Sequence, residues 1–171
     1  MPEPDWDIAP LAVADCDELG RVHMHIWREA YAGLMPPEYL AGLSETRCAE
    51  NWRRRLEQPE GADLEAMTLV ARRRGRIVGF ASAGPSRDDD APTECELYVL
   101  NQVSEVHGAG LADQLLDRVL GDRDASLWVV QENARARAFY ARSGFVDEGG
   151  RSAHEPTDAA EIRMVRRGGD D

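Results

Sequence analysis

The segment from Glu96 to Gly121 constrains this chain most, because it reads as a strand, a loop, a glycine-containing turn and a helix. Tyr98 to Leu100 are β-formers, and apolar residues recur at helical spacing from Leu111 to Leu120. Between them, Gly108 and Gly110 permit positive φ and leave backbone N–H groups uncrowded. The first helical turn leaves further N–H groups without partners. Such a turn can hold a phosphate or a pyrophosphate.

Two better-known phosphate loops fit this segment poorly. A Rossmann fingerprint needs a small residue at position 113, which is Asp113, and it usually opens a domain. A P-loop needs Gly-Lys-Ser/Thr, but the chain contains no lysine, so all 20 of its basic residues are arginine. A P-loop lysine and a lysine Schiff base are therefore excluded.

The hexapeptide from His107 to Ala112, which follows the strand ELYVL, resembles the acetyl-CoA-binding motif of the GNAT N-acetyltransferases. That motif is usually written Arg/Gln-Gly-x-Gly-x-Gly/Ala, and His107 stands in place of Arg or Gln. A downstream stretch resembles the family's second signature, N-x-x-A-x-x-F-Y-x-x-x-G-F. Its matching residues are Asn133, Ala136, Phe139, Tyr140, Gly144 and Phe145.

The element pattern agrees with this resemblance. We expect a strand at Ile8–Val13, a capping box at residues 15–18 that opens a helix, and a helix-turn-helix across residues 27–44. Further along we expect a helix at residues 44–56 and a hairpin at residues 67–83. The motif segments follow at residues 94–143. Two closing strands at residues 145–151 and 161–167 enclose a loop that contains His154.

This order predicts an α/β protein with a mixed sheet. The resemblance implies the GNAT acyl-CoA N-acyltransferase fold: a mixed, mostly antiparallel central sheet flanked by helices, with strands splayed at the cofactor site. A length of 171 residues indicates one domain spanning residues 1–171, with a core at about 7–167.

Composition limits partners and location. The chain is 43% hydrophobic and 30% charged and has no long apolar run, so we expect a globular protein without a membrane span. A net charge of −12 argues against nucleic-acid and anionic-membrane binding. Its N-terminus lacks the features of a signal peptide, and its cysteines, Cys16, Cys48 and Cys95, form no disulfide pattern. These features indicate the cytoplasm.

Acetyl-CoA is expected as the acyl-donor substrate, although coenzyme A is polyanionic and the protein also carries a net negative charge. Salt screens charges over about 8 Å, so donors that touch the pyrophosphate outweigh remote carboxylates. The arginines on the helix of the second signature either assist binding of coenzyme A or lie on the solvated surface. No metal is expected, because His23 and His25 face apart and no Cys/His cluster or HExxH is present.

The resemblance implies that the pantetheine arm pairs with the strand at Tyr98–Leu100 and that the glycine turn holds the phosphates. A backbone N–H near Val99 or Leu100 would also polarise the acetyl carbonyl. Replacement of the usual guanidinium by His107 implies weaker phosphate contact. The expected cofactor-binding residues are Tyr98, Val99, Leu100, His107, Gly108, Ala109, Gly110, Leu111, Ala112, Asn133, Ala136 and Tyr140.

Tyr140 is the expected general acid, because it occupies the family's tyrosine position and its phenol is roughly matched to a thiol leaving group. Glu96 is the expected base, since it shares a strand face with Tyr98. The alternative for Tyr140 is an aromatic residue that only packs against its neighbours. The alternative for Glu96 is a glutamate that only contributes polar surface.

Trp27 and Tyr31 are candidates for the acceptor pocket, because aromatic residues flank the predicted helix break; ordinary packing is the alternative. The resemblance implies transfer of acetyl to a primary amine of a small molecule by direct attack on the thioester. Acetylation of a protein N-terminus or lysine, and a non-catalytic acyl-CoA-binding module, are alternatives. The family often forms homodimers through its last strands. Acceptor identity, acyl length, the base and oligomeric state stay open.

Overall fold

The computed structural model describes residues 5–169. Within them the strands form one seven-stranded sheet in the order β1-β2-β3-β4-β5-β7-β6. Every neighbouring pair is antiparallel except β4 and β5. This mixed, mostly antiparallel sheet confirms the predicted fold class. The strands are β1 (Asp7–Pro10), β2 (Met67–Arg73), β3 (Arg76–Pro85), β4 (Cys95–Gln102), β5 (Ala125–Val130), β6 (Val146–His154) and β7 (Ala159–Arg166).

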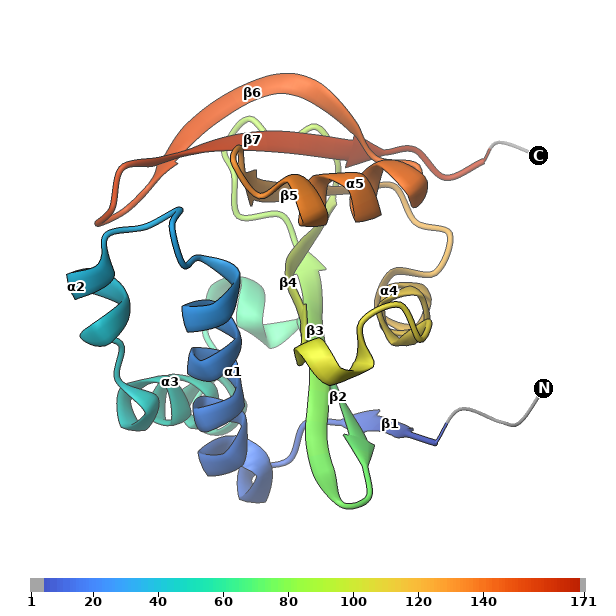
Figure 1. Ribbon diagram of the computed structural model, residues 1–171. Helices are drawn as coiled ribbons and strands as arrows, with labels where there is room; N and C mark the ends of the chain where they lie inside the picture. The colour runs from blue at the N-terminus through green and yellow to red at the C-terminus, as the bar shows by residue number, and fades with distance from the viewer. Residues whose placement is uncertain (1–4, 170–171) are drawn as a thin grey trace.

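Helices cover the sheet on both sides. The first three helices lie to one side of β2–β4 and α4 lies to the other (Figure 1). The α-helices are α1 (Cys16–Ala30), α2 (Pro37–Ala41), α3 (Glu45–Glu57), α4 (Leu111–Leu120) and α5 (Ala134–Arg142). Short 3-10 turns are η1 (Val13–Asp15), η2 (Gly61–Leu64) and η3 (Ser104–Val106). None of the helices in the described part combines the length and the apolar character that crossing a membrane requires.

Apolar residues form a core on each side of the sheet. The larger cluster joins α4, through Leu111, Leu115 and Val119, to the sheet and to Tyr140 and Phe145. A second cluster joins α1 and α3 to Phe80 on β3. Because both motif helices bury apolar side chains against the sheet, their first turns are held in fixed positions.

The sheet opens in its middle. Strand β4 pairs with β5 only at Cys95 and Glu96, although both strands continue beyond these positions. The β3–β4 register shifts so that Ser82 faces Val99 and Ala83 faces Leu97, which leaves Tyr98 as the extra residue of a bulge. The bulge thus lies inside β4 and not at its end. From Leu97 onward, the backbone edge of β4 that faces β5 has no strand partner.

Two local expectations are wrong. The predicted capping box at α1 does not form: Asp15 accepts from the N–H of Ala12 at 2.9 Å, and Glu18 accepts from the N–H of Ile77 at 2.7 Å. Both carboxylates also pair with Arg72, so long-range contacts replace the local cap. Strand β6 also runs on to His154, which we expected in a loop, because it continues to pair with β7 up to Ala159.

His23 makes stability depend on pH. Its Nδ1 accepts from Trp52 Nε1–H at 3.1 Å, and its ring packs 4.8 Å from Phe80. Burial, and then the charge of Arg55, lower the pKa of His23 from 6.5 to about 4. The unfolded chain therefore binds a proton that the folded chain excludes, and the free energy of unfolding should fall by roughly 2–3 kcal/mol as pH drops through this window.

The test is urea unfolding between the two pKa values of His23. His23→Gln should abolish this part of the pH dependence. His25→Gln, which removes an exposed histidine of the same helix, should keep it. Equal pH slopes in wild type and His23→Gln would contradict the assignment.

Candidate active site

A cleft of about 1000 Å³ lies between the start of α4 and α5. Asn101, Gln102 and Ser104 form one wall, together with the glycine turn that follows them. Ala136, Phe139 and Tyr140 of α5 form the other wall. The lining includes His107, Gly108, Gly110, Ala112, Asn133, Ala136, Tyr140 and Leu100 of the predicted cofactor-binding residues.

The glycine turn has the conformation that its sequence predicts. Gly108 has φ of 75° and Gly110, the N-cap of α4, has φ of 90°. A Cβ at either position would meet no atom within 4 Å, so the requirement for glycine is conformational and not steric. Within residues 5–169, the N–H groups of both glycines have no hydrogen-bond partner. These free donors and the start of α4 face the space where an anion can bind.

Two predicted cofactor-binding residues have other contacts. The N–H of Ala109 donates to Val106 at 3.2 Å, and Ala109 lies outside the cleft lining. The side chain of Leu111 is fully buried in the core. Ala109 therefore offers no free donor, and Leu111 offers only its backbone.

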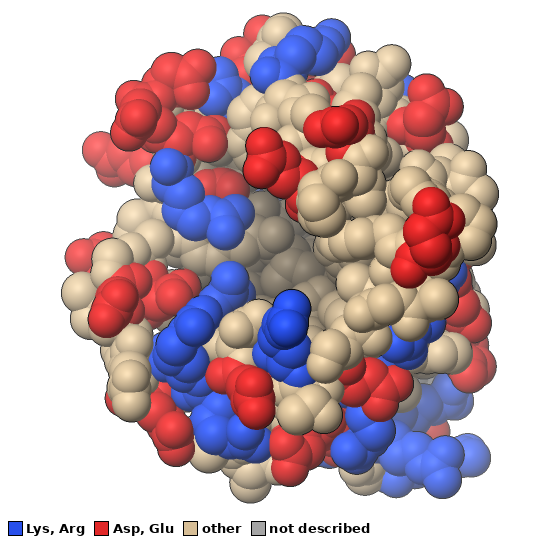
Figure 2. All heavy atoms as spheres, turned by 90° about the vertical axis from the view of Figure 1, so that its left-hand side faces the viewer, with Lys and Arg blue, Asp and Glu red and all other residues tan. Residues whose placement is uncertain are grey.

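A second, smaller pocket of about 340 Å³ lies where β4 and β5 separate. It contains both residues that we expected near the acceptor, Trp27 and Tyr31. Its other lining residues are Arg87, Asp88, Leu97, Tyr98, Val99, Leu100, Asn101, Leu127, Trp128, Val129, Val130, Asn133, Ala136, Tyr140, Ser152, His154 and Glu161. Figure 2 shows that the molecule is hollowed on the side that carries α2, with an uncharged floor and charged side chains at the rim.

Tyr140 stands where the two cavities meet. It lines both of them, although only 8% of its surface is exposed. Phe139 and Phe145 hold its ring edge-on at centroid distances of 5.4 and 5.7 Å. Burial, and then the nearby Tyr31, raise the pKa of Tyr140, and its hydroxyl has no hydrogen-bond partner among the described residues. The phenol thus remains protonated and available to a ligand.

Glu96 lies outside both cavity linings and is only 2% exposed. Arg87 donates three hydrogen bonds to it, from Nη2 to Oε1 at 2.7 Å, from Nε to Oε2 at 3.3 Å and from the backbone N–H to Oε2 at 2.9 Å. The carboxylate oxygens of Glu96 are thus occupied by Arg87 and line neither cavity. The role of Glu96 as the base stays a prediction, and holding Arg87 in place is the structural alternative.

Tyr98, the residue at the bulge, belongs to the same group. Its hydroxyl donates to the carbonyl of Pro85, and the Arg87 guanidinium lies 4.2 Å from its ring centroid. Burial raises the pKa of Tyr98 to about 12. Its side chain and that of Val99 line the smaller pocket only, whereas Leu100 lines both cavities. Tyr98 and Val99 are therefore not brought together with the other predicted cofactor-binding residues in the larger cleft.

Sequence reasoning missed two residues of the smaller pocket, His154 and Glu161. Both come from the closing β6–β7 hairpin. The His154 ring lies 5.4 Å from that of Trp27, although the residues are far apart in the chain. Burial along β7 does not alternate, so no local signal marked Glu161, and the strand pairing that brings it to the pocket was not readable from the sequence.

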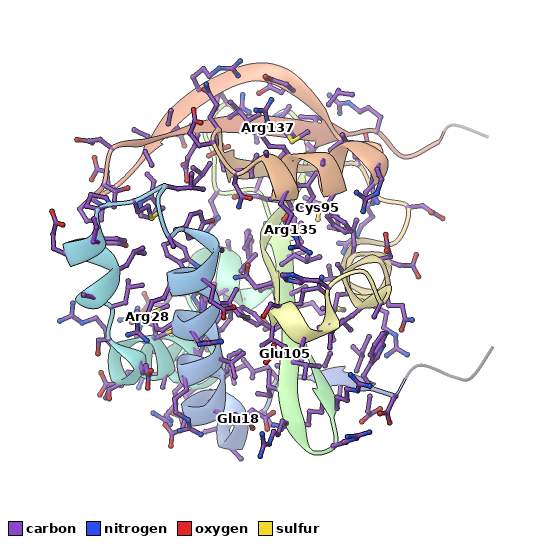
Figure 3. The ribbon with its side chains drawn as sticks, viewed as in Figure 1. Glu18, Arg28, Cys95, Glu105, Arg135 and Arg137 are labelled. Atoms are coloured by element: carbon purple, nitrogen blue, oxygen red, sulfur yellow. The ribbon has the colours of Figure 1, made fainter. Side chains whose placement is uncertain are left out.

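The arginines of α5 do not all serve the cleft. Arg135 and Arg142 line it, whereas Arg137 donates to the carbonyl of Gln131 at 3.0 Å. In Figure 3, Arg135 extends from α5 toward the segment that carries Glu105, and Arg137 lies on the opposite side of the helix. Between residues 5 and 169, no group of histidine, cysteine and acidic side chains has a metal-binding arrangement.

Comparison with known proteins identifies the family. An acetyltransferase (GNAT) domain model matches residues 65–147, which contain both signatures. An uncharacterized N-acetyltransferase of Mycobacterium tuberculosis is 35% identical over 169 residues, covering 90% of this chain and 99% of the relative. The chain belongs to the GNAT N-acetyltransferase family. The predicted family and enzyme class are thereby confirmed.

Relatives and solved structures extend this result. A Bacillus subtilis N-acetyltransferase is 26% identical, covering 70% of this chain and 68% of its own. The PaiA N-acetyltransferase of Thermoplasma acidophilum, solved in complex with coenzyme A, has a TM-score of 0.72 at 21% identity and covers 96% of this chain and 99% of its own. A GNAT structure from Rhodopseudomonas palustris has a TM-score of 0.71 at 18% identity and 98% coverage of both chains. These structures show the GNAT fold.

The Arg87–Glu96 pair can be tested by a double-mutant cycle. Arg87→Met should lower the free energy of unfolding by about 2 kcal/mol, because it leaves a buried carboxylate unpaired. Adding Glu96→Gln should restore part of this loss, since the amide costs less to bury. Urea unfolding at neutral pH measures both. Strictly additive losses would contradict the pairing.

Proposed function

We propose that this GNAT protein transfers the acetyl group of acetyl-CoA to a primary amine of a small molecule. The observation that carries the proposal is the meeting of the two cavities at Tyr140. A long donor needs the larger cleft and an acceptor needs the smaller pocket, and transfer requires that the two share a wall. The residues common to both linings form that wall: Leu100, Asn101, Asn133, Ala136 and Tyr140.

Several features of the larger cleft support coenzyme A as the donor. The free N–H groups of Gly108 and Gly110, at the start of α4, suit a pyrophosphate. Arg135 and Arg142 add positive charge within the cleft. The unpaired edge of β4 suits the amides of a pantetheine arm. The similar PaiA enzyme binds coenzyme A, which agrees with this assignment.

The chemistry follows from these positions. A neutral amine attacks the thioester carbonyl carbon, and a backbone N–H near Val99 or Leu100 polarises the carbonyl oxygen. The C–N bond forms and the C–S bond breaks, so negative charge collects on sulfur. The nitrogen becomes positively charged on attack and releases its extra proton to solvent. The Tyr140 hydroxyl gives its proton to that sulfur, and solvent returns a proton to the phenolate. Tyr140 is suited to this because it is buried, protonated and free of other partners.

The size of the smaller pocket favours a small acceptor over the predicted alternative, a protein N-terminus or lysine. Its volume of about 340 Å³ is at the lower end of ordinary ligand sites. Aromatic walls from Trp27, Tyr31 and Trp128 further narrow it. We also assign the protein to the cytoplasm, because its cysteines are free and buried as in reducing compartments.

Tyr140→Phe tests the mechanism. Thiol release from acetyl-CoA with a panel of small amines should fall about 100-fold in kcat, since general acid–base groups contribute factors of this order. Coenzyme A affinity should change little, because the phenyl ring stays. Tyr39→Phe, which removes a phenol outside both cavity linings, is the matched control.

Three results would count against this proposal. Equal kcat in wild type and Tyr140→Phe would remove Tyr140 as the acid. Bound coenzyme A without turnover of any amine would favour the non-catalytic binding module. Turnover of peptides alone would favour a protein acceptor. Each assay needs a blank without acceptor, since the native cysteines react with thiol reagents.

Gly108→Ala tests the donor site. The added Cβ forces strain at a φ of 75°, so both stability and the position of the anion-binding N–H groups should suffer. Gly75→Ala is a matched control, because Gly75 has a φ of 78° and equally free surroundings in the β2–β3 hairpin. Both variants should lose about 1 kcal/mol of stability.

Only Gly108→Ala should weaken coenzyme A binding, by about tenfold if one charge-assisted hydrogen bond is lost. Isothermal titration with coenzyme A measures this effect. The same affinity in both variants would mean that the turn does not hold the phosphates.

A further inference from the structure

Arg87 and Asp88, two of the charged residues that line the smaller pocket, are each paired with a group of opposite charge. Arg87 on the pocket wall is paired with the buried Glu96. Asp88 accepts from Trp128 Nε1–H at 2.8 Å and pairs with Arg163 at 3.2 Å. The guanidinium of Arg163 is itself nearly buried and also binds Asp90. Arg163 also pairs with Glu148, so this group has more carboxylates than guanidinium groups, but Arg87 and Asp88 on the pocket wall each have an ion-pair partner.

Glu161 is the exception. It belongs to β7, where it pairs with Val130 at the end of β5, and its side chain lines the pocket. Among residues 5–169, its carboxylate has neither a hydrogen-bond donor nor an ion-pair partner. Burial raises the pKa of Glu161, as expected for a half-buried carboxylate without compensation. Glu161 therefore gives the pocket an unbalanced negative charge.

Aromatic rings line the same pocket as Glu161. Trp27 lies 4.8 Å from Tyr31 and 5.4 Å from His154, measured between ring centroids, and all three line the pocket. Burial lowers the pKa of His154, so its imidazole is neutral at pH 7 and supplies no positive charge to Glu161. Aromatic faces beside a carboxylate attract organic cations, because ring quadrupole and carboxylate both favour positive charge.

We infer that Glu161 is the residue that binds the acceptor as an ammonium ion, so the acceptor is a small organic cation with an apolar body. This inference rests on the proposed function and names the substrate class of the same site. The positive charge of the acceptor provides the ion-pair partner that Glu161 lacks among the described residues. Its apolar part packs on Trp27 and Tyr31. An uncharged ligand or an acid would leave the half-buried carboxylate uncompensated. The bound ammonium gives one proton to solvent before its nitrogen attacks the thioester, because only the neutral amine is a nucleophile.

Binding without reaction tests this directly. Protein saturated with coenzyme A, which carries no acetyl group, is titrated with benzylamine and phenethylamine, which are charged at pH 7. Benzyl alcohol and phenethyl alcohol are the uncharged matches. Glu161→Gln should weaken binding of the amines at least about tenfold, the size of one charge-assisted hydrogen bond, and change alcohol binding less than about twofold.

Two variants control the experiment. Glu161→Asp keeps the charge and should retain part of the amine affinity. Glu132→Gln removes an exposed carboxylate outside both cavity linings and should bind as the wild type does. Circular dichroism and coenzyme A affinity confirm that each variant is folded.

The outcomes separate this inference from the proposed function. Equal amine affinity in wild type and Glu161→Gln, or no preference of the wild type for either amine over its alcohol, would overturn the inference. Acetyl transfer to amines by the wild type would still support the proposed function in that case. Amine binding that needs Glu161, without transfer from acetyl-CoA, would support the inference and contradict the proposed function.

Discussion

The separation of β4 from β5 is the constraint on which the rest of the site depends. These parallel neighbours pair only at Cys95 and Glu96, and the bulge at Tyr98 turns β4 away. Unpaired backbone groups are costly when buried, so an opening of this kind persists only where a ligand or solvent satisfies them. Both cavities use this opening, and α5 places Tyr140 across it. One interruption of the sheet thus underlies both cavities and, in the proposed function, the donor site, the acceptor site and their junction.

Local signals in the sequence predicted the donor side well. Gly108 and Gly110 read as a turn with positive φ, and Asn133 read as an N-cap; the structure has both features. Each depends on a few neighbouring residues, so its physics is contained in a short segment. The acceptor side was predicted less well, because Glu161 and His154 reach the pocket through strand pairing across the whole sheet. Pairing partners of that kind leave no local pattern.

The role expected for Glu96 illustrates the same limit. Strand alternation correctly placed it on the face of Tyr98, but alternation says nothing of what lies opposite. Arg87 comes from the loop after β3, and its guanidinium spans both Tyr98 and Glu96. Alternation cannot show whether a glutamate on a strand face has such a partner. Of the carboxylates near the pocket, Glu161 has no ion-pair partner among the described residues, whereas Glu96 and Asp88 are paired.

Charge at this site is therefore controlled by pairing and not by the net charge of −12. Most acidic side chains of the protein face solvent, where salt screens them over about 8 Å. Glu161 differs because it is half-buried beside aromatic rings, and a charge in such surroundings acts more strongly on a ligand than a surface charge does. The larger cleft combines Arg135, Arg142 and free N–H groups with two acidic residues, Glu29 and Asp113. In the proposed reaction, an anionic donor held by these N–H groups and arginines would meet a cationic acceptor at Tyr140.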